Sequence, residues 1–197
     1  MTLAIDEQPR VHRAKRWTKK EYNELVGMGA FRGQRVYLFR GEIIEMSPQL
    51  KPHAYAVMQL SHALFRVFGT DAGYFIRIQL PFNAPGETIP EPDALVCTQE
   101  EGNADPHPRE ALLVIEVADS SLFADRDKAL EYAAAQVPEY LIIDTNLRRV
   151  EVYRKPVPDP TTPLRFRYPP PIIIEANGTL ELLAKPGSSI PVAQFFQ

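Results

Sequence analysis

Asp93, Glu116 and Lys128 have the residue types and the spacing to act together in one site. Asp93 stands in "PEPDALV" (90–96), immediately before a run that reads as a buried strand. Glu116 interrupts "LLVIEVA" (112–118), which is otherwise a solid apolar strand. A carboxylate at either place is costly unless a partner compensates its charge. Lys128 lies in the predicted helix that follows Glu116, close enough in the chain to join the two acids.

A divalent metal ion would give Asp93 and Glu116 such a partner. If their strands are neighbours in a sheet, the backbones are ~5 Å apart and the carboxylates converge. Two bare carboxylates that close repel each other and raise each other's pKa. A hard cation such as Mg²⁺ or Mn²⁺ takes oxygen ligands, typically one or two carboxylates with several waters. The pair therefore predicts a Mg²⁺ or Mn²⁺ site.

Lys128 can reach this site because Ala118 leaves room beside it. Side chains alternate along a strand, so Ala118 shares the face of Glu116. A metal ion polarises a phosphate and its bound water, and an ammonium group orients the water and offsets developing charge. The three residues therefore favour phosphodiester hydrolysis, with Lys128 assisting the attacking water.

Helical and strand patterns in one unbroken series predict a single α/β domain around these residues. Thr18 and Glu21 form a capping box before a first helix, and "RVYLFRGEIIEMSP" (35–48) reads as a hairpin. The next elements are an amphipathic helix (51–69), three strands (74–82, 93–97 and 112–118), a serine-capped helix (120–136) and two further strands (139–144 and 148–154). A proline-rich segment and short strands complete the chain, and this order predicts a central mixed sheet flanked by helices.

Composition narrows the class of protein. The chain has 197 residues, a hydrophobic content of 45% and a charged content of 24%, which is typical of one globular domain. Its single cysteine, Cys97, allows no intramolecular disulfide, so we expect a cytoplasmic protein. The first residues lack the pattern of a secretory signal, and no segment has the ~20 apolar residues that a membrane helix needs.

Basic residues gather near the N-terminus although the net charge of the chain is −3. We divide the chain into a basic arm (1–16) and one domain (17–197). The cations in "RVHRAKRWTKK" (10–20) have two interpretations. They form a solvated arm, or they contact phosphates, since clustered cations are the electrostatic footprint of nucleic-acid binding.

The order and spacing of "PEPDALV", "LLVIEVADSS", "DRDK" and "VPEYLIID" resemble the PD-(D/E)XK nuclease superfamily. More narrowly, they resemble its Uma-type branch of bacterial restriction-endonuclease-like proteins. The resemblance runs from "YNELV" near the N-terminus to the tail "IPVAQFF".

The resemblance implies a restriction-endonuclease-like fold with added β-hairpins and a Mg²⁺- or Mn²⁺-dependent endonuclease that acts on DNA. It implies that Asp93 and Glu116 bind the metal, with the Val117 carbonyl as third ligand, and that Lys128 is catalytic. Nucleases of this kind commonly pair subunits to cut two strands, so the resemblance also implies a homodimer.

The sequence departs from the pattern of the superfamily at two places. The superfamily usually has lysine two residues after the acid, where this chain has Ala118; in the Uma-type branch the lysine lies in the following helix, which matches Lys128. The family also often carries "ELIDGE" at the hairpin, whereas this chain has "YLFRGE" (37–42). Glu42 or Glu45 would have to supply any second acidic ligand, with Glu42 the better match, and His53 is a further candidate near the site.

Each site residue also has a purely structural interpretation. Asp93 would cap the strand entry by accepting hydrogen bonds from backbone amides. Glu116 would pair with Arg77 or His53 in a structural network. Lys128 would form surface pairs with Asp125 and Glu131, each three residues away.

Two other classes of function compete with the endonuclease. A catalytically inactive nuclease-fold module would bind nucleic acid or a protein partner, because a fold does not guarantee an activity. A glycoside hydrolase would use the two acids directly. The expected closeness of the acids argues against an inverting glycosidase, whose carboxyl groups are roughly 6.5–9.5 Å apart, and so does the nearby lysine.

Overall fold

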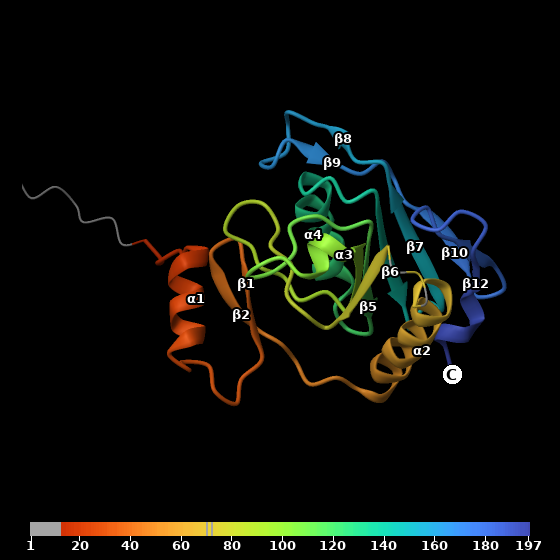
Figure 1. Ribbon diagram of the computed structural model, residues 1–197, viewed down its shortest axis with the longest axis horizontal. Coiled ribbons are helices and arrows are strands. Elements are labelled where there is room, and N and C mark those ends of the chain that lie inside the picture. The colour runs from red at the N-terminus through yellow and green to blue at the C-terminus, as the bar shows by residue number, and fades with distance from the viewer. Residues whose placement is uncertain (1–12, 70, 72) are drawn as a thin grey trace, which may run out of the picture.

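A six-stranded mixed sheet lies at the centre of the computed structural model, which describes residues 13–69, 71 and 73–197 (Figure 1). The strands run in the spatial order β10-β7-β6-β5-β4-β3. Along the chain they are β3 (Tyr74–Ile78), β4 (Ala94–Thr98), β5 (Leu113–Ala118), β6 (Glu139–Asp144), β7 (Arg149–Arg154) and β10 (Ile172–Glu175). β5 and β6 are parallel, whereas the other neighbouring pairs are antiparallel. The prediction of a central mixed sheet is confirmed.

Helices α2 (Lys51–Phe68) and α4 (Leu122–Ala134) cover opposite faces of this sheet. The alternation of side chains along β5 decides which residue meets which helix. Val117 belongs to the apolar core that contains Leu60 and Leu64 of α2, and Ala118 belongs to the core that contains Tyr132 of α4. Because α4 links the parallel strands β5 and β6, it has to cross back over the sheet directly after Ala118.

The N-terminal elements form a separate layer beside the sheet (Figure 1). Helix α1 (Lys19–Gly27) packs against the hairpin of β1 (Val36–Phe39) and β2 (Glu42–Glu45) through a core that contains Tyr22 and Leu38. The predicted capping box is present: the Thr18 hydroxyl accepts the Glu21 N–H at 3.2 Å, and the Glu21 carboxylate accepts the Thr18 N–H at 2.9 Å.

The remaining elements are short and lie around the core of the central sheet. These are α3 (Gln99–Gly102), β8 (Val157–Pro158), β9 (Phe166–Arg167), β11 (Thr179–Glu181), β12 (Ser189–Pro191) and the short 3₁₀ helix η1 (Val192–Phe195). β11 pairs with β12, and Leu180, Ile190 and Phe195 join the core under α2. No helix in the described ranges is both long and apolar enough to span a membrane.

The basic segment is only partly described, since residues 1–12 of the predicted arm lie outside the described ranges. Two of its described cations are held by acids of the domain. The Lys15 ammonium lies 2.5 Å from Glu21, and the Arg16 guanidinium lies 2.6 Å from Glu42. Both pairs are exposed to solvent, so they contribute little stability and leave the cations accessible to a phosphate.

Candidate active site

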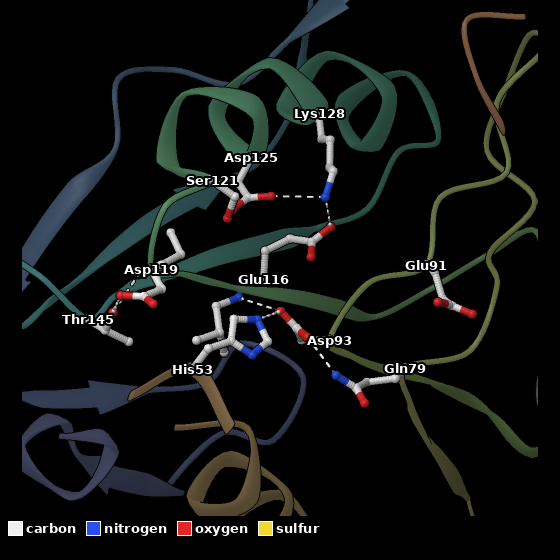
Figure 2. Close-up of polar contacts among 12 residues, drawn as sticks. His53, Gln79, Glu91, Asp93, Glu116, Asp119, Ser121, Asp125, Lys128 and Thr145 are labelled. Atoms are coloured by element: carbon white, nitrogen blue, oxygen red, sulfur yellow. Dashed lines mark hydrogen bonds and ion pairs between the residues drawn. The ribbon is translucent and has the colours of Figure 1, made fainter. Parts of the chain in front are cut away.

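The antiparallel pairing of β4 and β5 brings Asp93 and Glu116 together. Ala94 pairs with Ile115 in the sheet, so one further step along each strand sets Asp93 beside Glu116. Both side chains are largely buried, at 11% and 4% exposure. Figure 2 shows the two carboxylates on adjacent strands, with Lys128 reaching toward Glu116 from α4 and His53 lying beside Asp93. The predicted convergence of the three residues is present.

The Asp93 carboxylate is held by one partner from each neighbouring element. Its Oδ2 accepts the backbone N–H of Val117 at 2.8 Å and lies 3.2 Å from Nε2 of His53 at the start of α2. Its Oδ1 accepts the Gln79 amide at 3.1 Å. Only one of these partners is a backbone amide, and it belongs to the neighbouring strand, so Asp93 meets the interpretation as a strand cap only in part. A carboxylate fixed in this way is also pre-oriented as a ligand.

The Glu116 carboxylate is bound through one of its two oxygens. Its Oε1 accepts the Lys128 ammonium at 3.0 Å and the Tyr132 hydroxyl at 2.9 Å. The hydrogen bonds and ion pairs that Glu116 makes within the described part of the chain leave Oε2 without a partner. Arg77, considered as a partner of Glu116, instead donates to the Pro81 carbonyl at 3.3 Å, and His53 contacts Asp93.

Asp125 fixes the position of the lysine. The Lys128 ammonium donates to Asp125 Oδ1 at 2.9 Å, one turn back along α4. Asp125 is itself 2% exposed, and its Oδ2 accepts the Ser121 hydroxyl at 2.5 Å. Ser121 is the N-cap residue of α4, but its side chain makes no capping hydrogen bond because it serves Asp125. The expectation of a serine side-chain cap is wrong in that respect.

The Lys128 ammonium donates hydrogen bonds to two carboxylates, those of Glu116 and Asp125. The pKa values at this site reflect that one positive charge faces two acids. Burial raises the pKa of Glu116 to about 8; Lys128 opposes this, while Asp125 and Asp93 add to it. Burial works to lower the pKa of Lys128, but Glu116 and Asp125 hold it above its ordinary value. The cluster therefore contains more carboxylates than its lysine balances, and Glu116 holds a proton more readily as a result.

Asp93 stays ionised in spite of its burial. Burial works to raise its pKa, but His53 and the Val117 N–H stabilise the charged form and hold the pKa below its usual range. In return, the charge of Asp93 outweighs the effect of burial on His53 and raises the pKa of that imidazole. The two acids thus differ: Asp93 is a fixed anion, and Glu116 binds a proton more readily than an ordinary glutamate.

A cavity of about 530 Å³ opens in front of these residues and is lined by β1, the loop after β2, β5 and α4. Its wall contains more acidic than basic side chains. The acids are Glu45, Glu91, Asp93, Glu116, Asp119 and Asp125, and the permanently charged bases are Arg35 and Lys128. Such a wall attracts cations and repels a bare phosphate.

The donor set fits a magnesium-like cation in part. Asp93 and Glu116 offer carboxylate oxygens on one cavity wall, and Mg²⁺ needs only one or two carboxylates because it keeps several waters. In the described ranges, no three His, Cys, Asp or Glu side chains are grouped to hold a metal ion by themselves. Waters, a backbone carbonyl or substrate oxygens would have to complete the coordination. Val117, the predicted carbonyl ligand, also lines the cavity.

The structure does not bring Glu42 to this site. Glu42 is half exposed, pairs with Arg16 and lies outside the lining of the cavity. Glu45, the other candidate from the hairpin, does line it. The two residues that replace the family's hairpin acids have other roles: the Tyr37 ring lies 5.5 Å from the Lys128 ammonium, and Arg40 binds Glu131 at 2.6 Å.

Sequence reasoning missed Gln79 and Tyr132 as partners of the two acids. Tyr132 follows Lys128 by four residues and therefore lies on the same face of α4, which is a signal that the sequence does contain. Gln79 reaches Asp93 only because it follows β3 with a φ of 49°, and no sequence pattern indicates that conformation.

Comparisons with known proteins agree with this architecture. The family model of Uma2, described as "Putative restriction endonuclease", matches residues 20–193. A crystal structure from Anabaena variabilis ATCC 29413, described as a "putative nuclease belonging to DUF820", is similar with a TM-score of 0.67. It is 13% identical, and the match covers 81% of this chain and 88% of that chain.

A second solved structure is only distantly similar. The type IIG restriction endonuclease BpuSI has a TM-score of 0.35 at 18% identity, and the match covers 61% of this chain and 13% of that one. A search of curated proteins found no match. The Uma2 model spans most of the chain, and the Anabaena structure shares its fold. The chain therefore belongs to the Uma2 family of the PD-(D/E)XK, restriction-endonuclease-like proteins.

Proposed function

We propose that this protein is a Mg²⁺- or Mn²⁺-dependent endonuclease that hydrolyses phosphodiester bonds in DNA. The single observation that carries the proposal is the meeting of Asp93, Glu116 and Lys128 on the wall of one acidic cavity. Membership of a nuclease-like family supports it independently.

The acidic wall is itself an argument for a metal cofactor. A DNA phosphate is an anion, and a cavity with an excess of carboxylates repels it unless a cation intervenes. Asp93 and Glu116 would hold this cation through their carboxylate oxygens, with the Val117 carbonyl as a further ligand. When bound, a divalent cation polarises the phosphate and lowers the pKa of a coordinated water.

Lys128 has a separate role in the proposal. The Lys128 ammonium donates to Glu116 at 3.0 Å and to Asp125 at 2.9 Å. These two hydrogen bonds fix its position, and its remaining N–H is directed toward the cavity. From there it donates a hydrogen bond to the attacking water and offsets the negative charge that develops on the phosphate. Asp125 and Tyr37 keep the lysine in place but need not touch the substrate.

Metal binding is tested first by calorimetric titration of Mn²⁺ into the purified protein. We expect saturable binding that is lost in Asp93→Ala and Glu116→Ala but kept in Glu42→Ala, the matched control outside the cavity. Cleavage of circular DNA and of RNA is then screened with and without the metal. Mn²⁺ binding that survives both acid substitutions contradicts the assignment of the site.

The second candidate is a nucleic-acid-binding module without catalytic activity. Two observations favour it: Lys128 already pairs with Glu116, and the described residues contain no three-ligand metal cluster. Under this alternative, the wild type binds oligonucleotides but neither binds Mn²⁺ nor cuts any substrate. Asp93 would then serve only as the cap of its strand.

We also propose a homodimer, since cutting both strands of a duplex takes two sites. Light scattering of the wild type across a dilution series checks this, and a monomer at all concentrations contradicts it.

A further inference from the structure

A second cavity, of about 440 Å³, lies next to the acidic one on the side of the N-terminal layer. Helix α1, the turn that follows it and strand β1 form one side, and the loops that contain Pro81, Glu91 and His107 form the other. Three residues, Arg35, Tyr37 and Glu91, line both cavities. The two spaces therefore share a wall.

The second cavity differs from the first in the chemistry of its lining. Its apolar floor includes Tyr22, Phe31 and Ile89, and the rings of Tyr22 and Phe31 stack with centroids 6.0 Å apart at 26°. The Tyr22 hydroxyl donates to the Val36 carbonyl at 3.0 Å, which fixes the ring. A rigid aromatic floor in a cavity of this volume is typical of a site for a flat organic ring.

Polar groups surround this floor at the rim. Asn23, Gln34 and His107 can each donate and accept hydrogen bonds, and burial lowers the pKa of His107, which favours the neutral imidazole. Arg32 also lines the cavity, and its side chain makes no salt bridge with the described part of the chain. Arg35 lies on the shared wall, 2.9 Å from Glu91.

We propose that the second cavity binds an unpaired nucleobase of the substrate strand, one nucleotide away from the phosphate held at the acidic cavity. The inference rests on the proposed function and adds a substrate class to it. Bases are recognised by stacking on aromatic side chains and by hydrogen bonds to their edges, and this lining offers both. The shared wall lets one continuous strand occupy the two cavities.

A paired and stacked base cannot enter a cavity of this kind. The nucleotide has to be unpaired already, as in a single strand, a bulge or a frayed end, or the protein has to extrude it from the duplex. The proposed substrate is therefore DNA with an unpaired nucleotide beside the scissile bond, rather than an undisturbed duplex.

The test uses a single-stranded oligodeoxynucleotide that carries 2-aminopurine, whose fluorescence falls when it stacks on an aromatic ring. The same strand paired with its complement is the comparison substrate. Fluorescence is followed from the moment of mixing with protein and Mg²⁺, and the same samples on a denaturing gel report cleavage. Base binding and catalysis are thus measured separately.

Two variants probe the cavity, and one serves as a control. Asn23→Trp fills the cavity from the exposed face of α1, and Arg32→Gln removes the unpaired cation. Met28→Trp places the same large side chain at the end of α1, outside the lining, at a residue that is 79% exposed. None of the three residues belongs to the apolar core, so we expect all three variants to fold.

We expect quenching of the single-stranded probe by the wild type and by Met28→Trp, with affinities within ~2-fold of each other. Asn23→Trp should weaken binding ~10-fold, about 1.4 kcal/mol, since the variant removes the space in which one base would stack. In the fully paired duplex the probe is already stacked on its neighbours, so an unlabelled duplex is used as a competitor and should displace the single-stranded probe less well than an unlabelled single strand does. Cleavage of DNA with no quenching, or equal quenching in Asn23→Trp, overturns the base site and leaves the proposed function intact. Quenching without cleavage supports the base site while the nuclease proposal fails. Absence of any oligonucleotide binding overturns the inference.

Discussion

Two groups of buried carboxylates in this domain are compensated in different ways. Glu151 receives two hydrogen bonds from Arg126, one from Arg149 and one from Tyr153, so both of its oxygens are engaged. Glu116 is also shielded from solvent and more deeply desolvated, but its hydrogen bonds within the described part of the chain all fall on Oε1. Burial works to raise the pKa of both acids. The partners of Glu151 reverse this effect, and the partners of Glu116 do not.

This difference in hydrogen bonding distinguishes a structural ion pair from a carboxylate that can still bind another ligand. Arginine binds a carboxylate through two parallel hydrogen bonds and closes it to other ligands. Glu131 is closed by Arg40 in this way, whereas Lys128, as a point charge, leaves part of the Glu116 carboxylate free. Burial raises the pKa of the arginine-paired acids Glu131 and Glu139 as well, so the free oxygen beside the cavity, and not the raised pKa, distinguishes Glu116 as a candidate functional group.

The largest effect we predict is on catalysis at the two acids of the cavity, Asp93 and Glu116. Glu116→Gln and Asp93→Asn keep side-chain volume but remove a charge, and each should reduce DNA cleavage by at least ~100-fold, because a metal ion supplies several kcal/mol to the transition state. Initial cleavage rates measure this, with circular dichroism as the control for folding. Cleavage within tenfold of the wild type in either variant would refute the assignment.

The second prediction concerns a buried acid with both oxygens occupied, one by arginine and the other by the Leu183 N–H at 3.0 Å. Glu139 is fully buried, and its Oε1 accepts the Arg154 guanidinium at 2.7 Å. Arg154→Met leaves that carboxylate without its cation and should lower the free energy of unfolding by about 3 kcal/mol. Urea denaturation measures the change. The Mn²⁺ affinity of Arg154→Met should match that of the wild type. If this variant loses metal binding while it stays folded, the arginine-paired acids are not purely structural and the distinction between the two groups is wrong.

The third prediction is a pH dependence of stability in the metal-free protein. Since the pKa of Glu116 is raised to about 8, the folded protein holds a proton there that the unfolded chain releases at about its ordinary pKa of 4.5. Between these two values, stability falls as the pH rises. Glu116→Gln should flatten this part of the profile in urea titrations from about pH 5 to about pH 8. If stability depends on pH with the same slope in Glu116→Gln as in the wild type, the pH dependence comes from another residue.

The smallest effect is expected at Glu42. Its pair with Arg16 is exposed on both sides, and such pairs are worth about 0–1 kcal/mol. Glu42→Gln should therefore change neither the urea midpoint by a measurable amount nor the cleavage rate by more than ~2-fold. A large loss of activity in Glu42→Gln would contradict this prediction and indicate that the hairpin contributes to catalysis.

The sequence alone determined the elements and the three central residues. The spacing of the apolar residues identifies α2, α4 and the strands from β4 to β7. A helix buries side chains three or four residues apart, whereas a strand buries every second side chain or a continuous run. Asp93 and Glu116 stood out because a charge in a buried strand has to be explained, and Lys128 became a candidate through the order of the motifs. Their convergence follows if β4 and β5 are neighbours, and the structure pairs these two strands.

Only the tertiary structure decided which partners these residues have. Gln79, Val117 and His53 reach Asp93 from three different elements, and the sequence pattern of one element says nothing about the position of another. The same holds for Glu42, which matches the family pattern but pairs with Arg16, a residue that precedes α1. Local periodicity sets secondary structure, whereas hydrogen-bond partners and charge balance depend on contacts between segments far apart in the chain.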